Sequence, residues 1–152
     1  MSRLRTCLWF DGTAEDAARF YVELIPGSAI EGTLGRTATG APLMVNFHLA
    51  GVPYQGLNGG DMYKISPAVS IQLITEDQAE TDRIWAALIA DGGAESRCAW
   101  CSDRFGVSWQ VVPRQLMATV GGPDPEGAAR ATQAMMGMNK IDIAALEAAY
   151  RG

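Results

Sequence analysis

The chain has 152 residues, 48% of them hydrophobic and 19% charged, so it is long enough to bury the core of an ordinary soluble domain. Its net charge of −5 and its scattered basic residues argue against a nucleic-acid partner, because phosphate binding draws on clustered Lys and Arg. The absence of a long apolar run or a signal-peptide pattern predicts no membrane partner and a cytoplasmic location, in which the three cysteines are reduced.

The N-terminal part of the chain is predicted to form one strand, one helix and three more strands. A short apolar and aromatic run indicates a strand at residues 6–10, and Thr13 is the expected N-cap of the following helix. Pro26 and Gly27 end this helix. Three runs of β-type residues follow, at 29–34, 43–49 and 52–57.

The same order of elements then begins again after a loop at residues 58–67. A strand is expected at 68–75 and a helix at 77–90, and two further strands follow at 94–100 and 107–112, joined by a turn at 102–106. This second copy is therefore expected to be one strand shorter. In the tail, Asp124 and Asp142 are N-caps of two short helices that Gly137 separates.

Four long blocks of the sequence resemble one protein family. They read LWFDGTAEDAARFYVELIPGS, LNGGDMYKISPAVSIQL, DRFGVSWQVVPRQL and MMGMNKIDIAALEAAYRG. Together they resemble the PhnB-like family, often labelled demethylubiquinone 3-methyltransferase-like, within the vicinal oxygen chelate superfamily of glyoxalases, bleomycin-resistance proteins and dioxygenases.

This resemblance implies an α+β fold in which paired βαβββ modules form a cupped mixed sheet, with C-terminal helices. We expect a single domain over residues 1–152, with a first module at about 4–57, a linker at 58–67, a second module at about 68–113 and a helical tail at 114–152. The superfamily also implies a homodimer, and the Met-rich segment 128–138 offers an apolar face for that contact.

Catalytic members of the superfamily hold a metal in the cup on His, Glu or Gln ligands. By strand position, the matching residues in this chain are Cys7, Gln55, Ser70 and Gln110. A thiol, two amides and a hydroxyl suit the usual divalent metals poorly. We therefore predict no metal ligands and no cofactor, while a divalent metal stays open as an alternative.

The methyltransferase label has no matching cofactor motif in the sequence. Such enzymes ordinarily join a strand to a helix through a glycine-rich turn. The one segment that could be such a glycine-rich turn, residues 56–60, leads instead to Tyr63, Lys64 and a strand.

Three further motifs each have a structural and a functional interpretation. His48 could face the cup beside Asn46, but no orienting partner is evident, which favours a structural or surface role. Cys98 and Cys101 have zinc-like spacing without a second ligand pair, so ordinary cysteines are expected. The loop 58–67 should cross the mouth of the cup, where its polar residues either bind a ligand or are solvated; they are Asn58, Asp61, Tyr63 and Lys64.

The stretch 103–110 is predicted to be a tight hairpin in which Phe105 packs, while Trp109 or Gln110 either packs or lines the cup.

The sequence thus favours a protein that binds a small organic molecule in a metal-poor cavity, with its reaction and catalytic residues unassigned. The candidate lining is Gln55, Ser70, Trp109, Gln110, Cys7, His48 and Asn58. The alternatives are a metal-dependent isomerase, lyase or dioxygenase with atypical ligands, and non-catalytic sequestration of a ligand.

Overall fold

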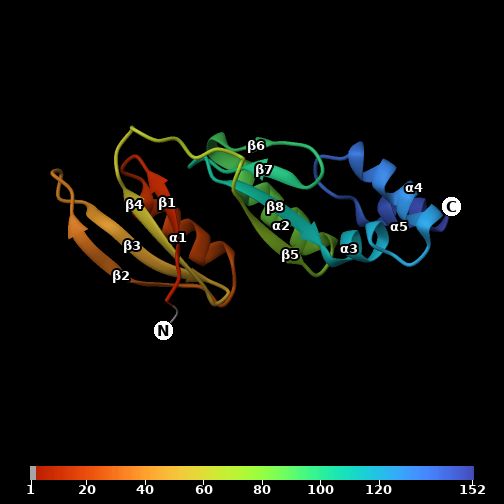
Figure 1. The fold of residues 1–152 in the computed structure, drawn as a ribbon, viewed down its shortest axis with the longest axis horizontal. Coiled ribbons are helices and arrows are strands. Elements are labelled where there is room, and N and C mark those ends of the chain that lie inside the picture. Colours follow the sequence, from red (N-terminus) through yellow and green to blue (C-terminus); the bar gives the residue numbers. More distant parts are fainter. Residues whose placement is uncertain (1–2) are drawn as a thin grey trace. The chain divides into compact units, whose positions relative to one another are not determined.

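The computed structural model describes residues 3–152 (Figure 1). The chain divides into two compact units, Met1–Ile65 and Ser66–Gly152, and the boundary falls within the predicted linker 58–67. Each unit contains one four-stranded mixed sheet with a helix between its first two strands, so the predicted α+β class and the repeated βαβββ order are both confirmed.

In the N-terminal unit the strand order is β1-β4-β3-β2, with β1 parallel to β4 and the other neighbours antiparallel. The strands lie within one to two residues of their predicted bounds. The elements are β1 (Thr6–Phe10), α1 (Ala14–Leu24), β2 (Ala29–Arg36), β3 (Pro42–Leu49) and β4 (Val52–Asn58).

Helix α1 packs against one face of this sheet. The buried side chains Leu8, Val45 and Phe47 lie on that face and alternate along their strands with less buried neighbours. At Gly56 the helix comes so close that an added Cβ would lie 3.0 Å from the Cβ of Ala14. The side chains that alternate with these along the same strands therefore point to the other face of the sheet, away from α1.

The start of α1 is stabilised by a residue distant in sequence. Thr13 occupies the N-cap position as predicted, but its side chain makes no capping hydrogen bond. Instead, Asn58 Oδ1 accepts a hydrogen bond of 2.9 Å from the backbone N–H of Ala14, and Asn58 Nδ2 donates to the carbonyl of Pro42 at 2.8 Å. The capping role predicted for Thr13 is thus performed by the last residue of β4.

The C-terminal unit repeats this arrangement with strand order β5-β8-β7-β6. Helix α2 was predicted to begin at Asp77, and this residue is instead its N-cap, where its side chain accepts a hydrogen bond of 2.8 Å from the backbone N–H of Glu80. The elements are β5 (Ser70–Thr75), α2 (Gln78–Ile89), the short 3₁₀ turn η1 (Ala90–Gly92), β6 (Ala94–Glu95), β7 (Trp100–Ser102) and β8 (Ser108–Pro113).

The prediction of a single strand at 94–100, and hence of a shorter second copy, is wrong. Cys98 and Ala99 have positive φ angles of 57° and 73°, so the chain turns there and separates β6 from β7. Non-glycine residues in this conformation are uncommon and leave no clear signal in the sequence. The turn is held by backbone hydrogen bonds from Cys98 to the carbonyl of Met138 and from Ala99 to that of Asn139.

Three helices, not two, form the tail: α3 (Arg114–Val120), α4 (Pro125–Met136) and α5 (Ile143–Arg151). The first was missed because Pro113 stands at its N-cap and provides no side-chain acceptor. The tail forms a core with β8 and the turn at Ala99, in which Leu116, Ile141 and Leu146 are buried. Met135 and Met138 pack against this core, so much of the Met-rich apolar face is used within the chain.

Among residues 3–152, none of the helices is both long enough and apolar enough to cross a membrane.

Candidate functional site

The candidate site is the face of the N-terminal sheet opposite α1, here called the open face. Because strand residues alternate, Cys7, Gln55 and Asn46 lie side by side on it across β1, β4 and β3. The next residue of β3 on the same face is His48. As far as residues 3–65 are described, α1 is the one helix of this unit, and it packs on the other side.

An amide pair occupies the centre of the open face. Gln55 Nε2 donates a hydrogen bond of 2.8 Å to Asn46 Oδ1, which fixes both side chains. The amide oxygen of Gln55 is then left as an acceptor, and the amide nitrogen of Asn46 as a donor. Beside them, burial raises the pKa of the Cys7 thiol, which keeps it neutral and makes it a poor nucleophile or metal ligand at pH 7.

His48 has the orienting partner that sequence reasoning did not find. Its Nδ1 lies 3.4 Å from Glu31 Oε1 on β2, and the other carboxylate oxygen, Oε2, accepts a hydrogen bond of 2.5 Å from Arg5. Arg5 also donates to the backbone carbonyl of Tyr54 at 3.2 Å. The three side chains therefore form a polar group at one end of the open face, which we call the Arg5–Glu31–His48 group.

Glu31 is held as an anion in this group. The hydrogen bond from Arg5 is the largest cause that lowers its pKa, and the contact with His48 lowers it further. A neutral His48 that donates its Nδ1–H to this carboxylate presents Nε2 as an acceptor. Sequence reasoning missed Glu31 because the pairing of β2 with β3 shifts between Ile30 and Gly32. Simple alternation along β2 therefore does not predict which face of the sheet Glu31 lies on.

The linker lies against the other end of the open face, at Trp9. The indole Nε1 donates a hydrogen bond of 2.8 Å to the carbonyl of Gly60, and the ring of Tyr63 packs edge-on at 4.9 Å. Tyr63, one of the predicted loop residues, is thereby brought to this face. Asn58 lies on the α1 side of the sheet, where both its amide oxygen and its amide nitrogen are hydrogen-bonded. Its position therefore favours a structural role.

In the C-terminal unit the structure brings together two of the predicted lining residues. Gln110 Nε2 donates a hydrogen bond of 2.8 Å to Ser70 Oγ. Gln110 on β8 holds the position that Gln55 holds on β4, between the first and third strands of its unit. Its direct neighbour on β5 is Gln72, which matches Cys7 and was overlooked because strand position alone did not give the register.

Trp109 lies on the other side of that sheet. Its side chain is fully buried, and Nε1 donates a hydrogen bond of 2.8 Å to Asp103 Oδ2. Cys101 lies directly opposite it on β7, and burial is the largest cause that raises the pKa of this thiol to about 12. The position of Trp109 favours the packing alternative over a role in ligand binding.

All three cysteines are free thiols, as expected. Cys98, which falls within the strand predicted at 94–100, lies in the turn before β7, where its sulfur contacts that of Met136 at 3.7 Å. Within residues 3–152, no three His, Cys, Asp or Glu side chains converge as a metal-binding group. The donors at the four expected positions, a thiol, two amides and a hydroxyl, do not fit the metals that the superfamily uses.

Comparison with known proteins gives two further findings. A family model described as 3-demethylubiquinone-9 3-methyltransferase matches residues 2–112, so the match ends before α3. A search of curated proteins finds no match.

Solved structures share the fold. A PhnB protein from Bacillus cereus is 26% identical, with a TM-score of 0.66, and the alignment covers 74% of this chain and 99% of that one. A protein from Pseudomonas aeruginosa is 20% identical, with a TM-score of 0.61 and coverage of 74% and 98%. A glyoxalase/bleomycin resistance protein from Albidiferax ferrireducens is 15% identical, with a TM-score of 0.50 and coverage of 74% and 99%.

Proposed function

The chain belongs to the PhnB-like family, whose model is described as 3-demethylubiquinone-9 3-methyltransferase, and we propose that it binds a small organic molecule on the open face of its N-terminal sheet. The observation that carries this proposal is the amide pair Gln55–Asn46 beside the Arg5–Glu31–His48 group, on a face that α1 leaves uncovered. Fixed polar groups of this kind orient a small ligand.

The chemistry of the face favours a ligand with hydroxyl or carbonyl oxygens. The amide pair supplies both an acceptor oxygen and donor N–H groups, and His48 Nε2 supplies a further acceptor. Arg5 is already engaged by Glu31 and by a backbone carbonyl, so its guanidinium is not free to pair with an anionic ligand. Trp9, at the far end of the face, provides an apolar surface for a ring.

No reaction is assigned by this proposal. The position of His48 against Glu31 supports a role as a proton acceptor if the ligand is turned over, since an imidazole oriented by a carboxylate suits that task. Methyl transfer has no such support, because Gly59 and Gly60 lead into the linker and then to β5, and not into a helix that could receive cofactor phosphates or carboxylates. A cytoplasmic location and association as a homodimer belong to the same proposal.

Calorimetric titration tests the proposal with a panel of small hydroxylated aromatic compounds and uncharged hydroxyketones. At least one of them should bind saturably, and Gln55→Leu should weaken it about tenfold by removing the hydrogen-bonding amide. Gln133→Leu, an identical change at an exposed position of α4, should leave the affinity within about twofold. Equal effects of the two substitutions, or no saturable binding across the panel, would contradict the proposal.

A further inference from the structure

The open face changes from polar to apolar along its strands. Beyond the amide pair, a line of apolar side chains crosses the sheet, one from each strand, and we call it the apolar row. Trp9 pairs with Leu57, Leu57 with Met44, and Met44 with Leu34, so their side chains share one side of the sheet. The row is two residues along β3 and β4 from the amide pair, and it therefore belongs to the open face.

The polar and apolar groups follow one another at regular steps. On β3, His48 lies two residues from Asn46, and Asn46 lies two residues from Met44. Because a strand rises about 3.3 Å per residue, each step is roughly 6.6 Å. A ligand whose oxygens meet the amide pair thus has the imidazole one step away in one direction and the apolar row one step away in the other.

The linker closes the row at the end formed by Trp9. The indole Nε1 already donates to the carbonyl of Gly60, so the remainder of this side chain is apolar ring. Tyr63 packs edge-on against it, and Gly59 lies so close to the indole that a Cβ would not fit between them. A wall of this kind suits the arm of a small molecule better than it suits a flat protein surface.

The burial of the row fits a binding surface. Leu57 and Met44, at its centre, are half-buried, whereas Leu34 on the edge strand β2 is 59% exposed. A single exposed leucine is ordinary on a protein surface. A continuous apolar row beside fixed hydrogen-bonding groups is instead typical of a site for a molecule with one polar and one apolar part.

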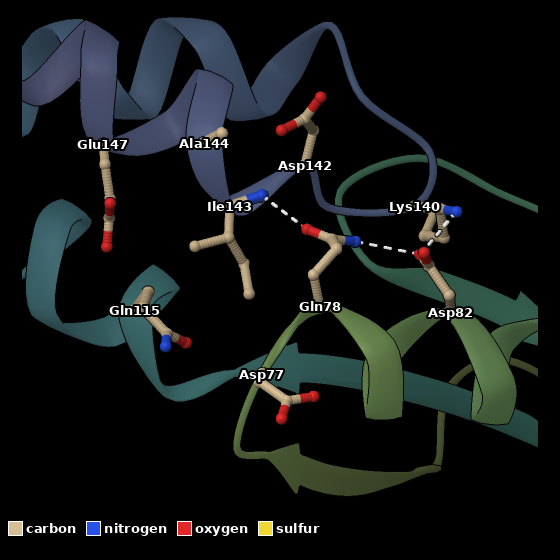
Figure 2. A pocket seen from close by; sticks show the side chains of 9 residues that line it. All are labelled: Asp77, Gln78, Asp82, Gln115, Lys140, Asp142, Ile143, Ala144 and Glu147. Carbon is tan, nitrogen blue, oxygen red and sulfur yellow. Dashed lines mark hydrogen bonds and ion pairs between the residues drawn. The ribbon is translucent and has the colours of Figure 1, made fainter.

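A pocket of the C-terminal unit, between α2, α3 and α5, has a different chemistry (Figure 2). Carboxylate and amide side chains make up most of its lining, and Lys140 Nζ lies 2.6 Å from Asp82 Oδ1 within it. Burying an uncharged arm there would separate these polar groups from water. The pocket therefore serves as the alternative location in the test below.

We infer that the ligand of the open face is amphiphilic, with an uncharged oxygenated head and an alkyl or aryl arm. The oxygens of the head bond to Gln55 and Asn46, and the arm lies over Leu57 and Met44. This inference rests on the function proposed above, and it adds that the apolar row determines which oxygenated ligands are preferred.

Calorimetric titration with a series of 4-hydroxyphenyl alkyl ketones tests the inference. The arm lengthens from methyl to propyl and pentyl while the head stays the same. The affinity should rise about twofold to threefold for each methylene, because each one removes apolar surface from water. If the methyl ketone binds and longer arms bring no increase, as expected where a second copy of the chain covers the row, the inference is wrong and the proposed function stands. Saturable binding by none of the three would contradict the proposed function itself.

Two matched substitutions locate the arm. Met44→Gln keeps the length of the side chain but makes the centre of the row polar, so it should reduce the affinity ratio of pentyl to methyl ketone at least threefold. It should leave the affinity for the methyl ketone within about twofold of wild type, because the head is still held. Met117→Gln, the same change at an exposed position of α3, should leave the ratio unchanged.

Equal ratios in the two variants would overturn the inference. The same conclusion would follow if ¹H–¹⁵N NMR showed the pentyl ketone shifting the backbone amide of Ile143, in the C-terminal pocket, and not those of Met44 and Leu57.

Discussion

Nδ1 of His48 lies 3.4 Å from Oε1 of Glu31, and this contact orients the chain's single histidine on the open face of the N-terminal sheet. Glu31 in turn is fixed by Arg5. An imidazole whose one nitrogen is held by a carboxylate has a defined tautomer, and the other nitrogen is then available to a ligand.

The tautomer of His48 should therefore depend on Glu31. In the wild type at pH 8, ¹⁵N NMR of the ring should show the Nδ1–H form, which donates to the carboxylate. In Glu31→Leu the ring should shift toward the Nε2–H form, which imidazoles generally prefer in water. Since the chain has one histidine, the spectrum needs no assignment. An unchanged tautomer in Glu31→Leu would show that the contact does not orient the ring.

Stability should depend on pH through Glu31. Its pKa is lowered from an ordinary value of 4.5 by the hydrogen bond from Arg5, so its contribution to the free energy of unfolding is present above about pH 4.5 and is lost as the pH falls through the lowered pKa. Chemical denaturation of wild type and Glu31→Gln should give a difference at pH 7 that shrinks as the pH falls below 4.5. A difference that grows toward acid would contradict this assignment.

The close approach of Gly59 to Trp9 should make that glycine sensitive to substitution. An added Cβ at Gly59 would lie 2.2 Å from the Cζ2 atom of Trp9, so the indole or the linker must move. Gly59→Ala should lower the free energy of unfolding by about 1–3 kcal/mol and change the tryptophan fluorescence. The cost should largely disappear when Gly59→Ala is made in a Trp9→Leu background; an additive double-mutant cycle would show that the clash is not its cause.

The buried carboxylate of Asp103 should be the most costly polar side chain to remove from the C-terminal unit. It accepts hydrogen bonds from the backbone N–H groups of Phe105 and Val107 and from the indole of Trp109. Asp103→Ala leaves three donors without this acceptor and should cost about 3 kcal/mol in urea unfolding. The control Glu76→Ala removes an exposed ion pair with Arg114 and should cost less than about 0.5 kcal/mol.

The elements with regular periodicity were predictable from the sequence. Strand β1 and the caps of α4 and α5 are as expected, because a short apolar run and an Asp at an N-cap are local signals. The turn at Cys98 and Ala99 was not predictable, since it depends on backbone hydrogen bonds to the tail. The same holds for the cap of α1, which Asn58 provides from 44 residues away.

Part of the candidate site followed from the sequence as well. Gln55 and Gln110 were placed on the correct strands, and each is on the face opposite its unit's first helix. Glu31 was missed because a bulge in β2 disrupts the alternation, and Gln72 because register is set by pairing between strands. The cavity that the two modules share in the sequence-based prediction stays a prediction.

The most direct test of the central claim is to locate a bound ligand by ¹H–¹⁵N NMR, using the compound of the panel that binds most tightly. The account predicts that the largest shifts fall on the side-chain amides of Gln55 and Asn46 and on the ring of His48, and that Gln55→Leu reduces the shifts of Asn46 and His48 at equal ligand concentration. Chemical-shift changes elsewhere in the chain, with the signals of these three side chains unchanged, would contradict binding at the open face.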